Sequence, residues 1–232
     1  MKTIEPARES LDQTADLTAA GLAQAAAGFA FDLFRSKQFC RLAGMEQLNR
    51  SEQDRIFNEL VVASVVLIML LLEAPDLRVA GEFQGYLAGL SKKIPRAYVD
   101  HLGTLGVETN HLQDWEKLIA MRYEEYARDR HDVRAAAMQI ESSEKGLDLD
   151  DLSKIHLLVP VQAVAIGCHH HICRGDTEGQ DDLFKLTLRS LSMFHVELRV
   201  RLEGGRITPL TRMRVALKQI VRRIGRRKRP SR

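Results

Sequence analysis

The chain has 232 residues, of which 45 % are hydrophobic and 28 % charged, and its net charge is +3. This length and composition are typical of a globular protein with a sizeable core, and they exclude global disorder. Three cysteines exclude a disulfide framework, and the acidic N-terminal stretch MKTIEPARESLDQTADL is unlike a signal peptide. We therefore expect a cytoplasmic protein in a reducing environment.

The first predicted helix covers residues 16–35 and begins at a capping Asp16. Apolar residues share one face of this helix, at Leu22, Ala26, Phe29 and Leu33. Its many Ala and Gly residues would let another helix approach closely.

A second helix is expected to begin at a capping box formed by Ser51 and Asp54 and to end before Pro75. Its residues 60–72 are apolar with the exception of Ser64. A run of ~13 residues covers only about 20 Å, whereas a membrane span needs roughly 20 apolar residues. The pattern favours a helix that is buried on all sides in a soluble core.

The middle of the chain predicts a packing surface, a short helix and the longest helix. Glycines recur every four residues, at Gly81, Gly85 and Gly89, which indicates either closely packed helices or a weak helix. A short helix is expected within residues 93–106. The longest helix is predicted over residues 109–141, with an apolar stripe at Leu112, Ile119, Tyr126, Val133 and Ile140. A self-pairing coiled coil is an alternative, although the intervening positions suit it poorly.

The second half begins with a polar connector, SSEKGLDLDD, over residues 142–151. An apolar run follows, in which Pro160 predicts a helix start or a kink. The next helix starts after RGDTEGQDD and carries a stripe at Phe184, Leu188, Leu191, His195, Leu198 and Leu202. Residues 196–202 alternate as a strand would, but the continuous stripe favours a helix. His195 is expected to be a hydrogen-bonded core residue.

These patterns predict an all-α fold. We expect an irregular helical bundle of six to eight helices with two fully buried central helices, at residues 56–74 and 160–173. The polar connector near residues 142–150 is a possible subdivision of this body.

The stretch GCHHHICRGD, residues 167–176, raises the question of a metal site. Successive residues of a helix rotate by about 100°, so three adjacent histidines cannot face one ion. Two pairs can, and they supply the candidate zinc ligands Cys168, His169, His171 and Cys173. Alternatively, the histidines interact with the negative end of their helix and the cysteines are small buried hydrophobes.

Other catalytic patterns are weak or absent in the sequence. A di-iron bundle needs two Glu-x-x-His pairs, and the chain offers one, Glu108 and His111. The sequence contains no P-loop, no Gly-x-Ser-x-Gly and no His-Glu-x-x-His. We therefore expect a protein that is not an enzyme.

The charged residues are distributed unevenly along the sequence. Residues 199–232 contain 13 Lys or Arg and one acidic residue, Glu203, which gives +12. Residues 1–198 contain 21 basic and 30 acidic residues, which gives −9. The chain therefore divides into an acidic helical body, residues 1–198, and a basic C-terminal helix and tail, residues 199–232.

A helix is predicted to start at Thr208 and Pro209 within the basic segment. The candidate anion-binding residues are Arg212, Arg214, Lys218, Arg222, Arg223, Arg226, Arg227, Lys228 and Arg229. Such a cluster attracts phosphates by counterion release, or anionic lipid at ~1 kcal/mol per basic residue. A solvated tail, or a helix docked on the acidic body, is the alternative.

These observations predict a non-enzymatic binding or regulatory protein. Its basic C-terminal segment would engage an anionic partner, which is a nucleic acid, an anionic membrane or an acidic protein. The acidic body would meet a protein partner, and a homo-oligomer is compatible with the sequence. Two alternatives stay open: a zinc protein that uses the Cys168–Cys173 cluster, and a peripheral membrane protein.

Overall fold

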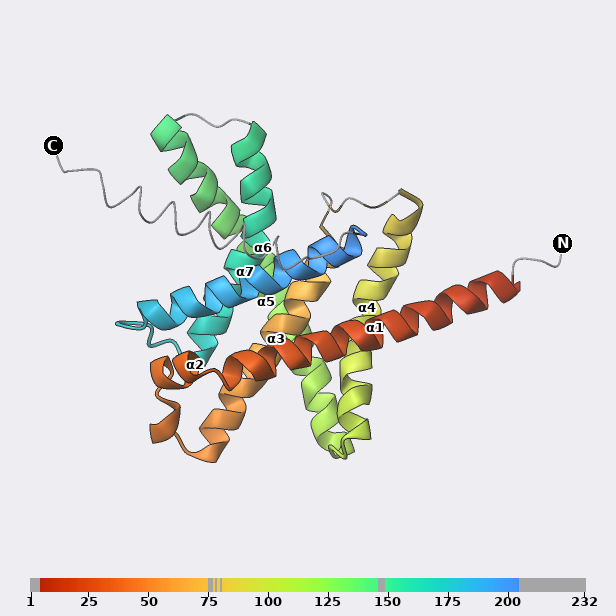
Figure 1. The fold of residues 1–232 in the computed structure, drawn as a ribbon, viewed down its shortest axis with the longest axis horizontal. Helices are drawn as coiled ribbons and strands as arrows, with labels where there is room; N and C mark the ends of the chain where they lie inside the picture. The colour runs from red at the N-terminus through yellow and green to blue at the C-terminus, as the bar shows by residue number, and fades with distance from the viewer. Residues whose placement is uncertain (1–4, 75–76, 78, 80, 146–148, 205–232) are drawn as a thin grey trace.

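The computed structural model describes residues 5–74, 77, 79, 81–145 and 149–204 (Figure 1). These residues form seven α-helices, two short 3₁₀ helices (Met45–Gln47 and Gly81–Phe83) and no strand. The α-helices are α1 (Glu5–Phe34), α2 (Lys37–Leu42), α3 (Arg50–Leu72), α4 (Gln84–Thr104), α5 (Thr109–Lys145), α6 (Leu149–Ile172) and α7 (Asp181–Leu202). The predicted all-α bundle of six to eight helices is confirmed for the described residues.

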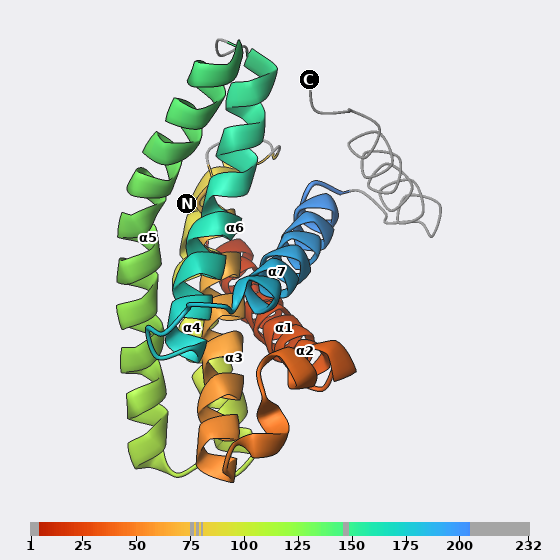
Figure 2. The same cartoon turned by 90° about the vertical axis from the view of Figure 1, so that its left-hand side faces the viewer.

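Helix α3 lies at the centre of the bundle and packs against α1, α4, α5, α6 and α7. Figure 2 shows α5 and α6 side by side along one edge of the molecule, with α1, α2 and α7 toward the other. Residues far apart in the sequence therefore meet around α3.

Every residue of α3 from Leu60 to Leu72 is buried, as the apolar run predicted. The polar exception, Ser64, donates its hydroxyl to the carbonyl oxygen of Leu60 at 2.7 Å, which satisfies it within the helix. The predicted cap of α3 is wrong by two residues. Asn49 is the N-cap, and its side-chain oxygen accepts a hydrogen bond from the backbone N–H of Glu52 at 2.9 Å. Ser51 therefore lies inside the first turn.

Helix α1 begins at Glu5, so the predicted start at Asp16 is wrong. Asp16 instead lies within the helix and pairs with Lys93 of α4 at 2.7 Å. The buried face of α1 consists of small residues and one leucine, namely Ala15, Ala19, Ala23, Ala26, Ala30 and Leu33. These alanines permit the expected close approach, and α1 packs directly on α3 and α4.

Helix α4 is one continuous helix, although the sequence predicted a short helix between breakers. Pro95 lies inside it, because one missing backbone hydrogen bond is offset by a buried apolar face that includes Leu90 and Ile94. The glycines do not mediate packing: Gly85 and Gly89 are exposed, and a methyl group added at either would meet no atom within 4 Å. Of the two alternatives that the glycine spacing left open, close helix packing is therefore wrong at Gly85 and Gly89.

Helix α5 is the longest helix in the described chain, as predicted. Ile119 and Tyr126 of its seven-residue stripe are fully buried, and Leu112 and Val133 are half-buried. The stripe is used within the chain, since α5 packs along α6 and also contacts α3 and α4. The connector to α6 is shorter than predicted, because α5 continues to Lys145.

Helices α6 and α7 complete the core. Pro160 lies inside α6 and does not start it. The second central helix, predicted at residues 160–173, is less enclosed than predicted, because Ile166 and His170 are exposed on its outer face. Residues 196–202 are helical, as the stripe of α7 indicated, and His195 is buried.

Two helices of the described chain are long and apolar enough to cross a membrane, by length and composition alone. One is α3, of which 83 % of the apolar window is buried inside the bundle. The other covers Asp12–Phe34 of α1, where only 28 % of the window is buried. The two helices therefore differ: α3 is enclosed by protein, whereas α1 keeps an apolar face on the surface.

Candidate functional site

The predicted anion-binding residues lie outside the described residues. They are Arg212, Arg214, Lys218, Arg222, Arg223, Arg226, Arg227, Lys228 and Arg229. The structure does describe the start of the basic segment, at the end of α7. Arg199 pairs with Glu203 at 3.0 Å, and Arg201 pairs with Glu197 at 2.7 Å. These two basic residues are thus matched by acids one helical turn away.

Three of the candidate zinc ligands lie on the last turns of α6 and Cys173 directly follows the helix, but the four side chains have different neighbours. Cys168 is fully buried, with its Sγ 3.9 Å from the carbonyl oxygen of Glu59. His169 is buried against the ring of Phe184. His171 contacts Glu125 of α5 through Nε2, at 2.7 Å.

The fourth candidate, Cys173, borders a surface pocket. No group of three or more His, Cys, Asp or Glu side chains among the described residues has the geometry to hold a metal ion. The pKa values of the cluster also reflect packing. Burial raises the pKa of the Cys168 thiol and lowers the pKa of His169, so both groups are held in their neutral forms. The described residues therefore provide no converging ligand set for zinc.

A buried polar network, which sequence reasoning missed, joins α3, α5 and α6. Arg122 of α5 donates two hydrogen bonds to the Glu59 carboxylate of α3, at 2.8 and 3.1 Å. It donates a third to Glu125 at 3.1 Å, and Glu125 in turn contacts His171 of α6 at 2.7 Å. The side chains of Arg122 and Glu59 are only 12 % and 9 % exposed. We call these four residues the interhelical charge network.

The two buried charges of the interhelical charge network neutralise each other. Burial opposes the positive charge of Arg122, but the hydrogen bonds and the negative charge of Glu59 outweigh it and raise the pKa of the guanidinium. Beside the network, Tyr126 is fully buried, and among the described residues its hydroxyl has no hydrogen-bond partner. The network fixes the positions of three helices through paired polar groups.

A second charged cluster closes the C-terminal end of α6. Arg55 of α3 donates to the carbonyl oxygens of His171 and Ile172, at 2.7 and 2.9 Å. These are among the last carbonyls of the helix, which otherwise lack intrahelical donors. Glu52 joins Arg55 to Arg174, and the hydrogen bonds from Arg174 and Arg55 lower the pKa of the Glu52 carboxyl. This cluster lines a pocket of about 280 Å³ that also contains Cys173.

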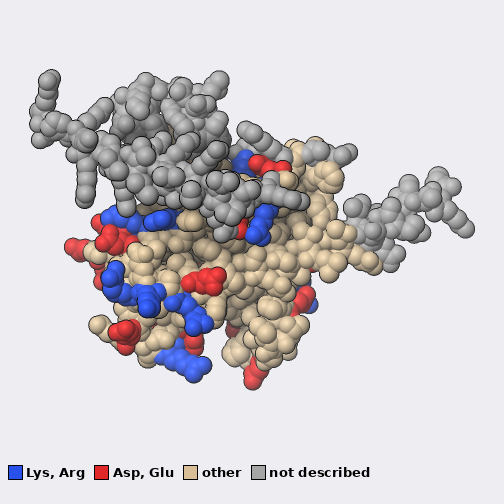
Figure 3. All heavy atoms as spheres, in the orientation of Figure 1, with Lys and Arg blue, Asp and Glu red and all other residues tan. Residues whose placement is uncertain are grey.

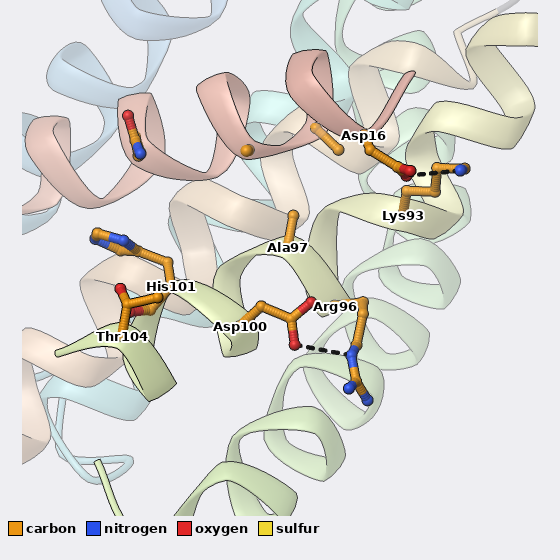
Figure 4. A pocket seen from close by; sticks show the side chains of 10 residues that line it. Asp16, Lys93, Arg96, Ala97, Asp100, His101 and Thr104 are labelled. Atoms are coloured by element: carbon orange, nitrogen blue, oxygen red, sulfur yellow. Dashed lines mark hydrogen bonds and ion pairs between the residues drawn. The ribbon is translucent and has the colours of Figure 1, made fainter. Parts of the chain in front are cut away.

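A shallow groove of about 390 Å³ runs between α1 and α4 (Figure 4). Its floor is formed by alanines of both helices, including Ala19 and Ala97. Two ion pairs border it: Asp16 with Lys93 at 2.7 Å, and Arg96 with Asp100 at 3.0 Å. The hydrogen bond that Lys93 donates to Asp16 is the main cause that raises the pKa of Lys93. The groove therefore has an apolar floor and a charged border.

The Glu-x-x-His pair of the sequence analysis and the third cysteine, Cys40, lie elsewhere in the fold. Glu108 and His111 are both exposed at the start of α5. Cys40 donates its thiol to the carbonyl oxygen of Phe34, at 3.3 Å. The interhelical charge network was missed because Glu59 and Arg122 are 63 positions apart in the sequence. One signal in the sequence could have identified the network. Glu59 and Arg122 are charged residues that each lie on the apolar face of a helix, where a buried charge needs a partner.

No protein-family model, no curated protein and no solved structure matches this chain.

Proposed function

We propose that this protein is a non-enzymatic binding or regulatory protein whose basic C-terminal segment engages an anionic partner. The distribution of charge along the chain carries the proposal. No Asp or Glu follows Glu203, whereas 11 Lys or Arg residues follow it. A segment with this composition concentrates positive charge and binds polyanions by releasing their counterions.

The end of α7 supports this proposal. The last acids of the sequence, Glu197 and Glu203, pair with Arg201 and Arg199 of the same helix. In the body, Arg122 is matched by Glu59 and Arg174 by Glu52, both between different parts of the chain. These cations of the body thus pair with acids of the body, while the segment beyond residue 204 contains no acid of its own.

The test compares the full chain with a chain that ends at Gly204. Binding to double-stranded DNA and to RNA is measured by fluorescence anisotropy between about 50 and 200 mM salt. If six or more cations contact phosphates, affinity should fall by about 10³–10⁵ over this range. The truncated chain should lose this binding while keeping its melting temperature. Equal binding by both chains contradicts the proposal.

A charge-matched pair of variants separates the segment from the overall charge. In the first variant, Arg226, Arg227, Lys228 and Arg229 are replaced by Gln. In the second, four exposed basic residues of the body are replaced by Gln, namely Arg50, Lys92, Lys117 and Arg189. Both variants lose four positive charges, but only the first should weaken binding. Equal losses would assign the effect to net charge alone.

The class of partner is decided by parallel assays with the same variants. Vesicles with about 30 % phosphatidylserine are compared with neutral vesicles by sedimentation, and polyglutamate represents an acidic protein surface. Salt-sensitive pelleting with anionic vesicles alone identifies a peripheral membrane protein. Binding to none of these polyanions contradicts the proposal.

A further inference from the structure

The outward face of α1 is uncharged and largely exposed, and within the described chain only its last residue, Phe31, meets other side chains, namely the ring of Phe57 and the guanidinium of Arg35. Its exposed residues recur at alternating spacings of four and three, at Leu17, Gly21, Gln24, Gly28 and Phe31. Leu17 is 76 % exposed and Phe31 is 47 % exposed. A methyl group added at Gly21 or Gly28 would meet no atom of the described residues within 4 Å, so within this part of the chain the middle of the face is open to another backbone. We call these five residues the α1 stripe.

The α1 stripe lies on a stretch without charge. No Asp, Glu, Lys or Arg occurs between Asp16 and Asp32, a helix length of about 22 Å at 1.5 Å per residue. Figure 3 shows an uncharged surface to the right of its centre, where α1 crosses the molecule in Figure 1. A solvent-exposed face of this kind marks an interaction surface.

A lipid bilayer fits this face poorly. The uncharged length is shorter than the ~30 Å hydrocarbon core of a membrane, and the inner face of α1 is packed on α3 and α4. Helices that lie in a membrane interface carry basic residues on their polar face. The border of the stripe is instead mixed in sign: Asp12 and Asp16 lie at one end, where anionic lipid is repelled, and Asp32 lies with basic residues at the other. A protein surface is the better match.

The charges at the two ends of the stripe are complementary. Asp12 and Asp16 lie at the first end with Lys93, which is 3.8 and 2.7 Å from them, so this end has a net charge of −1. At the other end, Asp32 is accompanied by three exposed basic residues, Arg35, Lys37 and Arg41, which gives +2. Two copies of the stripe placed antiparallel would bring each end against its opposite.

We propose that the α1 stripe packs antiparallel against the α1 stripe of a second copy of this chain, around a two-fold axis near Gln24. In this arrangement Leu17 contacts Phe31 of the second copy, and the two glycines allow the helix backbones to approach. A two-fold interface requires one patch to be complementary to itself, as this patch is. The proposal does not depend on the C-terminal segment or on its partner.

Sedimentation equilibrium of the full chain tests the dimer. Because Gln24 faces its own copy, Gln24→Glu and Gln24→Lys each place like charges together and should weaken dimerisation at least tenfold. An equimolar mixture of the two variants should restore the dimer, because the charges are then opposite. Gln113→Glu and Gln113→Lys, at an exposed position of α5, are the matched controls and should leave dimerisation unchanged. A monomeric full chain, or no restoration in the mixture, overturns the proposal.

Cysteine cross-linking tests the orientation, in a chain with Cys40→Ser and Cys173→Ser. Gln24→Cys should form a disulfide-linked dimer on oxidation. Leu17→Cys alone should not, because the two cysteines would be about 21 Å apart along an antiparallel pair and a disulfide needs Cα atoms within about 7 Å. A mixture of Leu17→Cys and Phe31→Cys should cross-link. Efficient cross-linking of Leu17→Cys to itself would overturn the antiparallel arrangement.

Two competing occupants of the stripe give different results. If the C-terminal segment of the same chain covers it, the full chain is a monomer and the chain that ends at Gly204 becomes a dimer. If a membrane covers it, Gln24→Glu reduces vesicle binding and leaves the mass in solution unchanged. Either result overturns the proposal. A dimer of the same affinity with and without residues 205–232 supports it.

Discussion

Replacing Gly167 by Ala should destabilise the protein, although the same change stabilises most helices. Gly167 of α6 lies against the ring of Tyr126 of α5, and an added methyl carbon would be 2.2 Å from Cε1 and 2.7 Å from Cδ1. Carbon atoms in contact are ~3.5–4.0 Å apart, so the ring would have to move by about 1 Å or more. Tyr126 is fully buried, and a close-packed interior offers little space for that movement.

The magnitude follows from two opposing effects. Alanine gains about 1 kcal/mol over glycine in a helix interior. Overpacking of a core costs typically ~1–3 kcal/mol and sometimes more, and a 2.2 Å approach is at the severe end. An overpacking cost of about 3–4 kcal/mol less the gain of about 1 kcal/mol gives an expected net loss of about 2–3 kcal/mol in the free energy of unfolding, which lowers Tm by roughly 4–12 °C for a chain of this size.

Thermal and urea unfolding measure this loss against a matched control. Gly89→Ala on α4 makes the same change where no atom lies within 4 Å, and it should stabilise the protein by ~0.5–1 kcal/mol. In a double-mutant cycle, Tyr126→Leu should relieve part of the Gly167→Ala loss, because the obstructing ring is gone. If Gly167→Ala raises Tm as Gly89→Ala does, then α5 and α6 are not in this close contact.

Three other measurements examine the buried polar groups. Glu59→Gln leaves the buried Arg122 with the Glu125 carboxylate alone and should cost up to ~3–5 kcal/mol, whereas Glu59→Leu combined with Arg122→Met should cost far less. Equal losses in urea unfolding would argue against a buried pair. Burial raises the pKa of Tyr98, and burial together with the hydrogen bond to Glu73 raises the pKa of Tyr123 to about 12. The unfolded chain therefore ionises first, near pH 10, and Tm should fall as the pH rises from about 10 to 12; a constant Tm there would contradict this. The buried Cys168 should react with a thiol reagent only on unfolding, whereas the half-buried Cys40 and Cys173 should react in the native protein. Mass spectrometry of peptides from the labelled native protein measures this, and modified Cys168 in that sample would contradict the prediction.

The interhelical charge network gives α5 a fixed position on the core. Ile119 and Tyr126 of α5 are buried, and Arg122 lies one turn from each of them on the same face. Apolar contacts are tolerant of small rotations, whereas two hydrogen bonds to Glu59 are directional. Substitution of Arg122 should therefore loosen the register of α5 as well as lower stability.

Local errors in the sequence predictions share one physical cause. Ser51 and Asp54 have the spacing of a capping box, but Asn49 makes the capping bond two residues earlier. Pro95 and Pro160 are typical of helix boundaries, yet both lie inside helices. An N-cap hydrogen bond or a proline inside a helix changes the free energy by about 1–3 kcal/mol. The burial of an apolar helix face contributes more and therefore decides where the helix begins and ends.

The sequence by itself determined that the chain is helical, that residues 60–72 are enclosed, and that residues 196–202 continue a helix. These features follow from the periodicity of apolar residues along a single segment, which any helix must bury. Only the tertiary structure decided that Glu59 meets Arg122, that Gly167 meets Tyr126, and which face of α1 remains outside. Such contacts join residues from separate helices, and their distances depend on how whole helices pack, which no local pattern records.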